Sequence, residues 1–71
     1  MTAEEWIEAY AAALGRPAPS PAEMEAILAL ASVAAHSSER RAAPIACWLA
    51  AQAGVSLDEA RAAAERLGTG E

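Results

Sequence analysis

The sequence contains no lysine and no phenylalanine, and its five basic residues are all arginine. Ten acidic residues give the chain a formal net charge of −5 at pH 7. A surface that binds nucleic acid needs a basic face, because binding depends on neutralising phosphates and releasing their counterions. The charge balance therefore argues against nucleic acid as a partner.

Cysteine and histidine occur once each, as Cys47 and His36. One cysteine cannot form an intrachain disulfide, which favours a cytoplasmic protein, and the two residues lack the ligand count of a structural zinc site. A Cys47–His36 nucleophile pair is conceivable, but Cys47 falls within an apolar helix, where thiols usually serve in packing. We therefore expect no metal, no cofactor and no enzymatic activity.

Long hydrophobic runs are also missing. The longest nearly uncharged stretch, residues 42–57, contains Pro44 and Gln52 and is shorter than the about 20 apolar residues that a spanning helix needs. Near the start, Glu4 and Glu5 stand where a secretory signal would carry basic residues. We expect neither a signal peptide nor a membrane segment.

Alanine and helix-capping signals are abundant. Three capping boxes begin at Thr2, Ser20 and Ser56, where a hydroxyl can accept from the backbone N–H three residues on and a glutamate can reach back. Glycines then follow the apolar segments, as is typical of helix ends. These signals predict a compact all-α bundle in one domain over residues 1–71, with helices over residues 3–14, 21–37, 44–53 and 57–67.

Pro44 sets the predicted start of the third helix. A proline in a helix interior removes a hydrogen bond and clashes with the preceding turn, at a cost of roughly 3 kcal/mol. A helix capped by Ser38 would place Pro44 beyond its first turn. We therefore assign residues 37–43 to a connection and Pro44 to the first helical position.

Bulk for the predicted core comes from the few large side chains. Alanine faces let helix axes approach closely, and the gaps between them are expected to be filled by Trp6, Tyr10, Met24 and Trp48. The two tryptophans are accordingly assigned to packing, and a ligand platform is the less favoured alternative.

Two of the predicted helices have more apolar surface than one core requires. The helix over residues 21–37 is apolar on two faces, one of which contains Leu30 and Val33, and such a helix must be covered on both. The helix over residues 44–53 is apolar all round apart from one glutamine, as in a buried or interface helix. We expect self-association, or contact with a partner protein, through one of these two helices, with Leu30, Val33 and Trp48 as contact residues.

Arg40 and Arg41 precede the predicted helix start at Pro44. Free N–H groups and the dipole at a helix N-terminus favour an anion, and His36 can approach the same corner. One hypothesis is therefore a site for a phosphate-bearing small molecule made by His36, Arg40 and Arg41. The alternative is structural: His36 caps its own helix, Glu39 neutralises one arginine, and the other bonds helix carbonyls.

The same stretch resembles a known family. The residues that carry the resemblance are Glu5-Trp6-Ile7, Ala35-His36, Arg40, Ala42-Ala43-Pro44-Ile45 and an apolar helix closed at Gly54. Together they are similar to a family of short uncharacterised actinobacterial helical domains that occur alone or joined to molybdenum cofactor guanylyltransferase. The chain departs from that pattern at Arg41, where many members carry proline, and at Cys47-Trp48. The resemblance implies an accessory role in molybdenum cofactor biosynthesis and points to His36, Arg40 and Pro44.

Three classes of function follow. The first is a non-catalytic accessory domain that binds an anionic ligand or a molybdenum cofactor biosynthesis protein. The second is a plain helical module for protein interaction or dimerisation. A minimal enzyme is the least expected, because no nucleophile, base and orienting group converge in the sequence.

Overall fold

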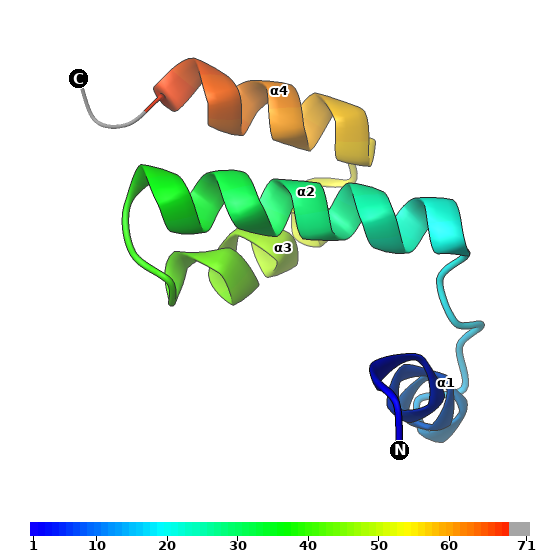
Figure 1. Ribbon diagram of the computed structural model, residues 1–71. Coiled ribbons are helices and arrows are strands. Elements are labelled where there is room, and N and C mark those ends of the chain that lie inside the picture. The colour runs from blue at the N-terminus through cyan, green and yellow to red at the C-terminus, as the bar shows by residue number, and fades with distance from the viewer. Residues whose placement is uncertain (69–71) are drawn as a thin grey trace.

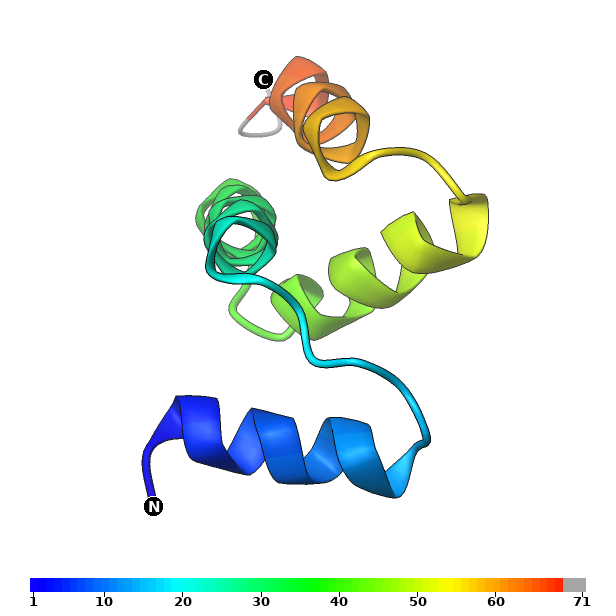
Figure 2. The same ribbon diagram turned by 90° about the vertical axis from the view of Figure 1, so that its right-hand side faces the viewer.

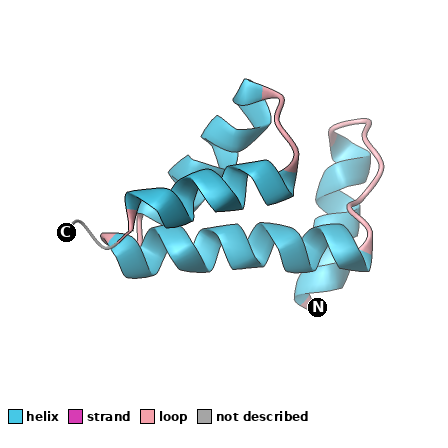
Figure 3. Cartoon of the chain, turned by 90° about the horizontal axis from the view of Figure 1, so that it is seen from above, coloured by secondary structure: helices cyan, strands magenta, loops and turns pink. Residues whose placement is uncertain are grey.

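The computed structural model describes residues 1–68, so residues 69–71 of the predicted domain lie outside the described part. Four helices follow one another: α1 (Ala3–Ala13), α2 (Pro21–Ser37), α3 (Ala42–Ala53) and α4 (Leu57–Leu67) (Figure 1). All other described residues form loops and turns (Figure 3). The all-α fold with four short helices is thus confirmed.

All three predicted capping boxes are formed. The hydroxyls of Thr2, Ser20 and Ser56 accept from the backbone N–H three residues on at 3.1, 3.1 and 3.0 Å. In return, the glutamate at each of those positions accepts from the capping residue's own N–H at 2.8, 2.8 and 3.2 Å. These reciprocal bonds satisfy N–H groups that the helix itself leaves without partners, and they fix where α1, α2 and α4 begin.

The start of α3 differs from the prediction. The helix begins at Ala42, so Pro44 is its third residue and not its first. The N–H groups of the first helical turn have no partner within the helix, and proline is therefore tolerated throughout that turn. Pro44 rules out a helix capped by Ser38, but it is compatible with every start that keeps it within the first turn. α1 also ends one residue earlier than predicted, at Ala13.

The end of α1 is a tight glycine cap followed by a proline-containing connector. Gly15 adopts a φ of 70°, its N–H donates to the Ala12 carbonyl at 3.0 Å, and the N–H of Arg16 donates to the Ala11 carbonyl at 2.9 Å. This pair of bonds is the Schellman arrangement. The connector over residues 16–20 then leads to α2, and α1 lies on the opposite side of the molecule from α4 (Figure 2).

α2 is the central helix, and both α3 and α4 pack against it (Figure 1). Leu30, in the middle of α2, is the one large side chain in the described residues that is buried, at 2% exposure. Ala11 of α1 is the only other buried residue of the described part. The molecule measures 40 × 25 × 18 Å and has little interior for its size.

The predicted aromatic core is wrong. Trp6 and Trp48 are 56% and 61% exposed, and Tyr10 is also exposed. Small residues face α2 instead: Ala43, Ala46, Cys47 and Ala50 of α3 are all half-buried. Because small side chains let two helix axes come close, α3 packs through its alanine side and its large residues fall on the other side.

Candidate docking surface

The outward side of α3 is a continuous apolar stripe. Ile45, Trp48 and Leu49 are spaced so that they share one helix face, and they are 60%, 61% and 55% exposed. We call these three residues the α3 outer face. A hollow of about 610 Å³ adjoins it and is lined by Pro44, Ile45 and Leu49 together with the turn that connects α2 and α3.

A second apolar stripe runs along α1. Trp6, Tyr10 and Leu14 recur at intervals of four residues and are each more than half exposed. The rings of Trp6 and Tyr10 stack, with centroids 5.0 Å apart and planes inclined by 23°. We call these three residues the α1 stripe. Isolated apolar side chains on a surface are ordinary, whereas aligned stripes of this kind are candidates for an association surface.

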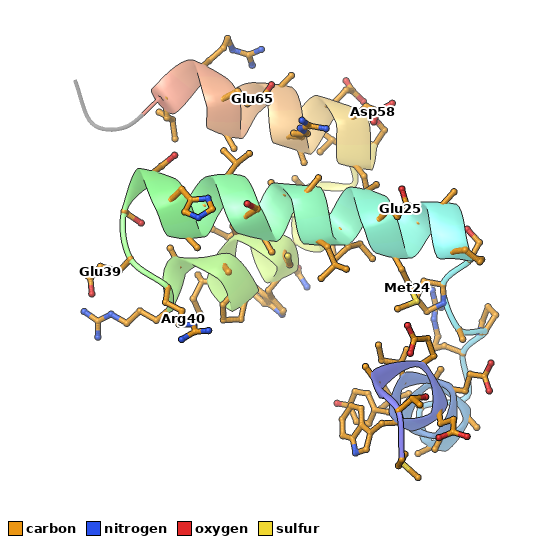
Figure 4. All side chains as sticks on the ribbon, viewed as in Figure 1. Met24, Glu25, Glu39, Arg40, Asp58 and Glu65 are labelled. Carbon is orange, nitrogen blue, oxygen red and sulfur yellow. The ribbon has the colours of Figure 1, made fainter. Side chains whose placement is uncertain are left out.

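The side of α1 next to this stripe faces the connector and α2. Ile7 is half-buried and lines a small hollow together with Pro19 and Met24. The side chain of Met24 points from α2 toward α1 (Figure 4). Ile7 and Ala11 thus lie on the more covered side of α1, and the α1 stripe is left uncovered.

The structure separates the three residues that the sequence predicts for self-association. Leu30 is a correction: it is buried between α2 and its neighbours, so it has no surface to offer a partner. Val33 is half-buried. Trp48 is exposed and belongs to the α3 outer face.

His36, Arg40 and Arg41 all lie at or near the turn that joins α2 and α3, and all three are exposed. The His36 ring nitrogen Nδ1 lies 3.2 Å from the Ser32 hydroxyl one turn earlier. Arg41 forms an ion pair with Glu39 at 3.4 Å between two exposed side chains, an arrangement that contributes little stability. Arg40 and Glu39 project from the same turn (Figure 4).

The N-terminus of α3 offers fewer donors to an anion than the sequence suggested. The N–H of Ala42 already donates to the Glu39 carbonyl at 3.0 Å, and that of Ala43 donates to the Arg40 carbonyl at 3.1 Å. Pro44 has no N–H. The Glu39 carboxylate beside Arg41 also repels an anion. The phosphate-site hypothesis stays a prediction that depends on the three side chains alone.

Cys47 and His36 do not form a nucleophile pair. The Cys47 sulfur lies 4.0 Å from the Ile27 carbonyl oxygen on the inward side of α3, whereas His36 contacts Ser32. Across residues 1–68, no group of three or more metal-ligating side chains comes together. Over the same residues, none of the helices has the length and apolar character required to cross a bilayer.

A family model described as a domain of unknown function (DUF6457) matches residues 1–69. The chain belongs to this family. No curated protein and no solved structure matched the chain. The match extends from the capping box of α1 to beyond the end of α4, so this DUF6457 domain includes both apolar stripes and the α2–α3 turn.

Sequence reasoning missed most of the candidate surface of this DUF6457 domain. Trp6 and Tyr10 of the α1 stripe were assigned to the core, and neither Ile45 nor Leu49 was predicted as a contact residue. A signal was present within α3: its residues 43, 46, 47 and 50 are all small, whereas residues 45, 48 and 49 are all large. When a helix packs closely on its small side, the large side must face outward.

Proposed function

We propose that this chain is a non-catalytic accessory domain that docks another protein chain through the α3 outer face. The observation that carries the proposal is the inverted distribution of side chains on α3, with small residues against α2 and Ile45, Trp48 and Leu49 in solvent. Large aromatic and aliphatic side chains of this kind supply most of the free energy of association at protein interfaces.

We place the domain in molybdenum cofactor biosynthesis, at the formation of molybdopterin guanine dinucleotide. The support is the resemblance of residues 35–54 to actinobacterial domains that occur alone or joined to the guanylyltransferase of that pathway. A domain that is fused to an enzyme in some proteins is a natural docking partner of that enzyme in others. The partner is accordingly a cytoplasmic molybdenum cofactor protein or a second copy of the chain.

Calorimetric titration of the purified guanylyltransferase with the purified domain tests this proposal. We expect saturable binding that weakens by at least about 30-fold in Trp48→Glu, because central tryptophans commonly contribute about 2 kcal/mol or more. Leu28→Glu is the matched control, since Leu28 is an exposed apolar residue of α2 outside the α3 outer face. Equal weakening in both variants would contradict docking through α3, and absence of binding would remove the pathway assignment.

A phosphate-bearing small molecule is the second candidate ligand. The observation that favours it is Arg40, which makes no side-chain hydrogen bond or ion pair within residues 1–68 and lies next to the exposed Arg41. Binding to the native state alone must raise the unfolding midpoint by mass action. We expect inorganic phosphate or a guanine nucleotide to raise the midpoint of the wild type. His36→Ala and Arg40→Ala should both abolish the rise. A rise that persists in both variants would place the ligand elsewhere.

A further inference from the structure

We propose that α1 is a detachable arm, which separates from α2 and loses its helical hydrogen bonds while α2, α3 and α4 stay folded together. Local stability within one domain ranges from near zero in sparsely packed segments to the full free energy of unfolding in the core. The proposed opening of α1 goes beyond docking through α3 and is independent of it, because no residue of the α3 outer face takes part.

α1 is the least covered of the four helices. Nine of its eleven residues are exposed, and only Ile7 and Ala11 are half-buried or buried. In α2, by comparison, ten of seventeen residues are half-buried or buried. Because tertiary packing supplies most of the stability of a helix in a protein, α1 receives the least support from the rest of the chain.

The packing of α1 is also separate from the packing around Leu30. Ile7 lines a small hollow with Pro19 of the connector and with Met24 in the second turn of α2, and the Met24 side chain points toward α1 (Figure 4). Leu30 lines a different hollow, together with residues of α3 and α4. The two hollows share no lining residue. Separation of α1 therefore uncovers Met24 and leaves the contacts of Leu30 in place.

Both helices that meet at the connector have ends of their own making. The start of α2 is capped by Ser20 and Glu23, which bond to each other's backbone N–H and need nothing from α1. α1 has its own capping box at Thr2 and its own glycine cap at Gly15. An isolated helix shorter than about 12–15 residues is nonetheless marginal in water. Once α1 has separated, its eleven residues are therefore too few to keep it helical, whereas α2 keeps its cap.

Hydrogen exchange of the full chain, followed residue by residue by NMR, provides the experiment. After correction for the intrinsic rate of each amide, we expect the amides of residues 7–13 to exchange at least about 100-fold faster than those of residues 28–33 around Leu30. Amides of α1 that are as well protected as those around Leu30 would overturn the proposal, because α1 would then open only when the whole domain unfolds.

A matched pair of variants tests whether the two regions are independent. Ile7→Ala should leave exchange in residues 28–33 within about 3-fold of the wild type, as expected for sites that share no partners. Leu30→Ala removes a buried side chain, and it should accelerate exchange in residues 28–33 by at least about 30-fold. It should not change the rates in residues 7–13, which exchange through the separate opening of α1.

An Ile7→Ala variant that accelerates exchange in residues 28–33 as strongly as Leu30→Ala would show one cooperative unit and contradict the detachable arm. If Leu30→Ala does not fold, the wild-type rates and the rates of Ile7→Ala still decide, since neither depends on that variant. Binding of the guanylyltransferase through Trp48 is a separate measurement, so the detachable arm and the proposed function can each fail alone.

Discussion

α3 and α4 pack against the same central helix and have nearly the same length, 12 and 11 residues, but their outer faces are opposite in character. α4 turns Leu57, Ala60 and Ala64 inward and presents charged residues to water, two of which, Arg61 and Glu65, pair at 3.2 Å. α3 turns its small residues inward and presents Ile45, Trp48 and Leu49.

The difference lies in the kind of side chain that each helix leaves in water. α4 is an amphipathic surface helix, with an apolar inward side and a charged outward side. α3 has the composition of a helix with cover on both sides, yet only one side is covered within the chain. The outer face of α3 is thus an apolar side that the packing of α2, α3 and α4 leaves in solvent, and it is the surface through which we propose docking.

The largest expected effect is a loss of stability, caused by a change in α2, the helix against which both α3 and α4 pack. Leu30 is buried on α2, and it lines the groove in which residues of α3 and α4 meet. Leu30→Ala should lower the free energy of unfolding by about 2–5 kcal/mol, because it removes buried methyl groups and leaves a cavity. Urea denaturation followed by circular dichroism measures the loss. A change below about 1 kcal/mol would contradict the burial of Leu30.

The next largest effect is on association, and it compares a change on the outer face of α3 with a change on the outer face of α4. Leu49→Glu on α3 should weaken association by about 10- to 150-fold, the equivalent of the roughly 1.5–3 kcal/mol gained by burying a leucine. Glu65→Gln on the exposed, charged side of α4 should leave association unchanged. The measurement is the dependence of the unfolding midpoint on protein concentration, which association with a second copy produces. Equal effects of the two changes would remove the distinction between the faces.

A smaller effect concerns how the two helices begin. α4 has a capping box at Ser56, whereas α3 has no side-chain cap. Ser56→Ala should reduce stability by about 1 kcal/mol, which corresponds to a fall of roughly 4–8 °C in the melting temperature of a domain this small. Calorimetry checks the shift. Arg41→Ala, at the equivalent position of α3, removes no cap and should leave the melting temperature within about 2 °C of the wild type.

The smallest effect is a change in stability that tests which residue begins α3. Because Pro44 lies in the first turn, it restricts the unfolded chain at no cost to the helix. Pro44→Ala should therefore destabilise the domain by about 0.4–1 kcal/mol. If Pro44 lay in a helix interior, the same change would stabilise the domain by up to roughly 3 kcal/mol. The sign of the change in urea midpoint separates the two placements.

The sequence was sufficient to predict those structural features that depend only on residues within about four positions of one another. The capping boxes at Thr2, Ser20 and Ser56 each involve residues only three apart, so their hydrogen bonds could be predicted without a fold. The positive φ angles of Gly15 and Gly54 belong to the same class. Pro44 was less decisive, since several starting residues keep it within the first turn.

The candidate surface could not be predicted in the same way. Trp6, Tyr10 and Trp48 are the largest side chains, and by hydrophobicity alone they belong in a core. Whether they are buried depends on how closely α3 approaches α2 and on where the connector holds α1. Both depend on contacts between residues far apart in the sequence, such as Cys47 beside Ile27.

The sequence by itself thus determined four helices, the capping boxes that begin three of them and an acidic net charge. Only the tertiary structure decided which side of each helix faces water. The physical reason is that α3 has two apolar sides of different size, and burial of either would remove apolar area from solvent. Close packing of alanines on α2 selected the small side, and that choice left Ile45, Trp48 and Leu49 exposed.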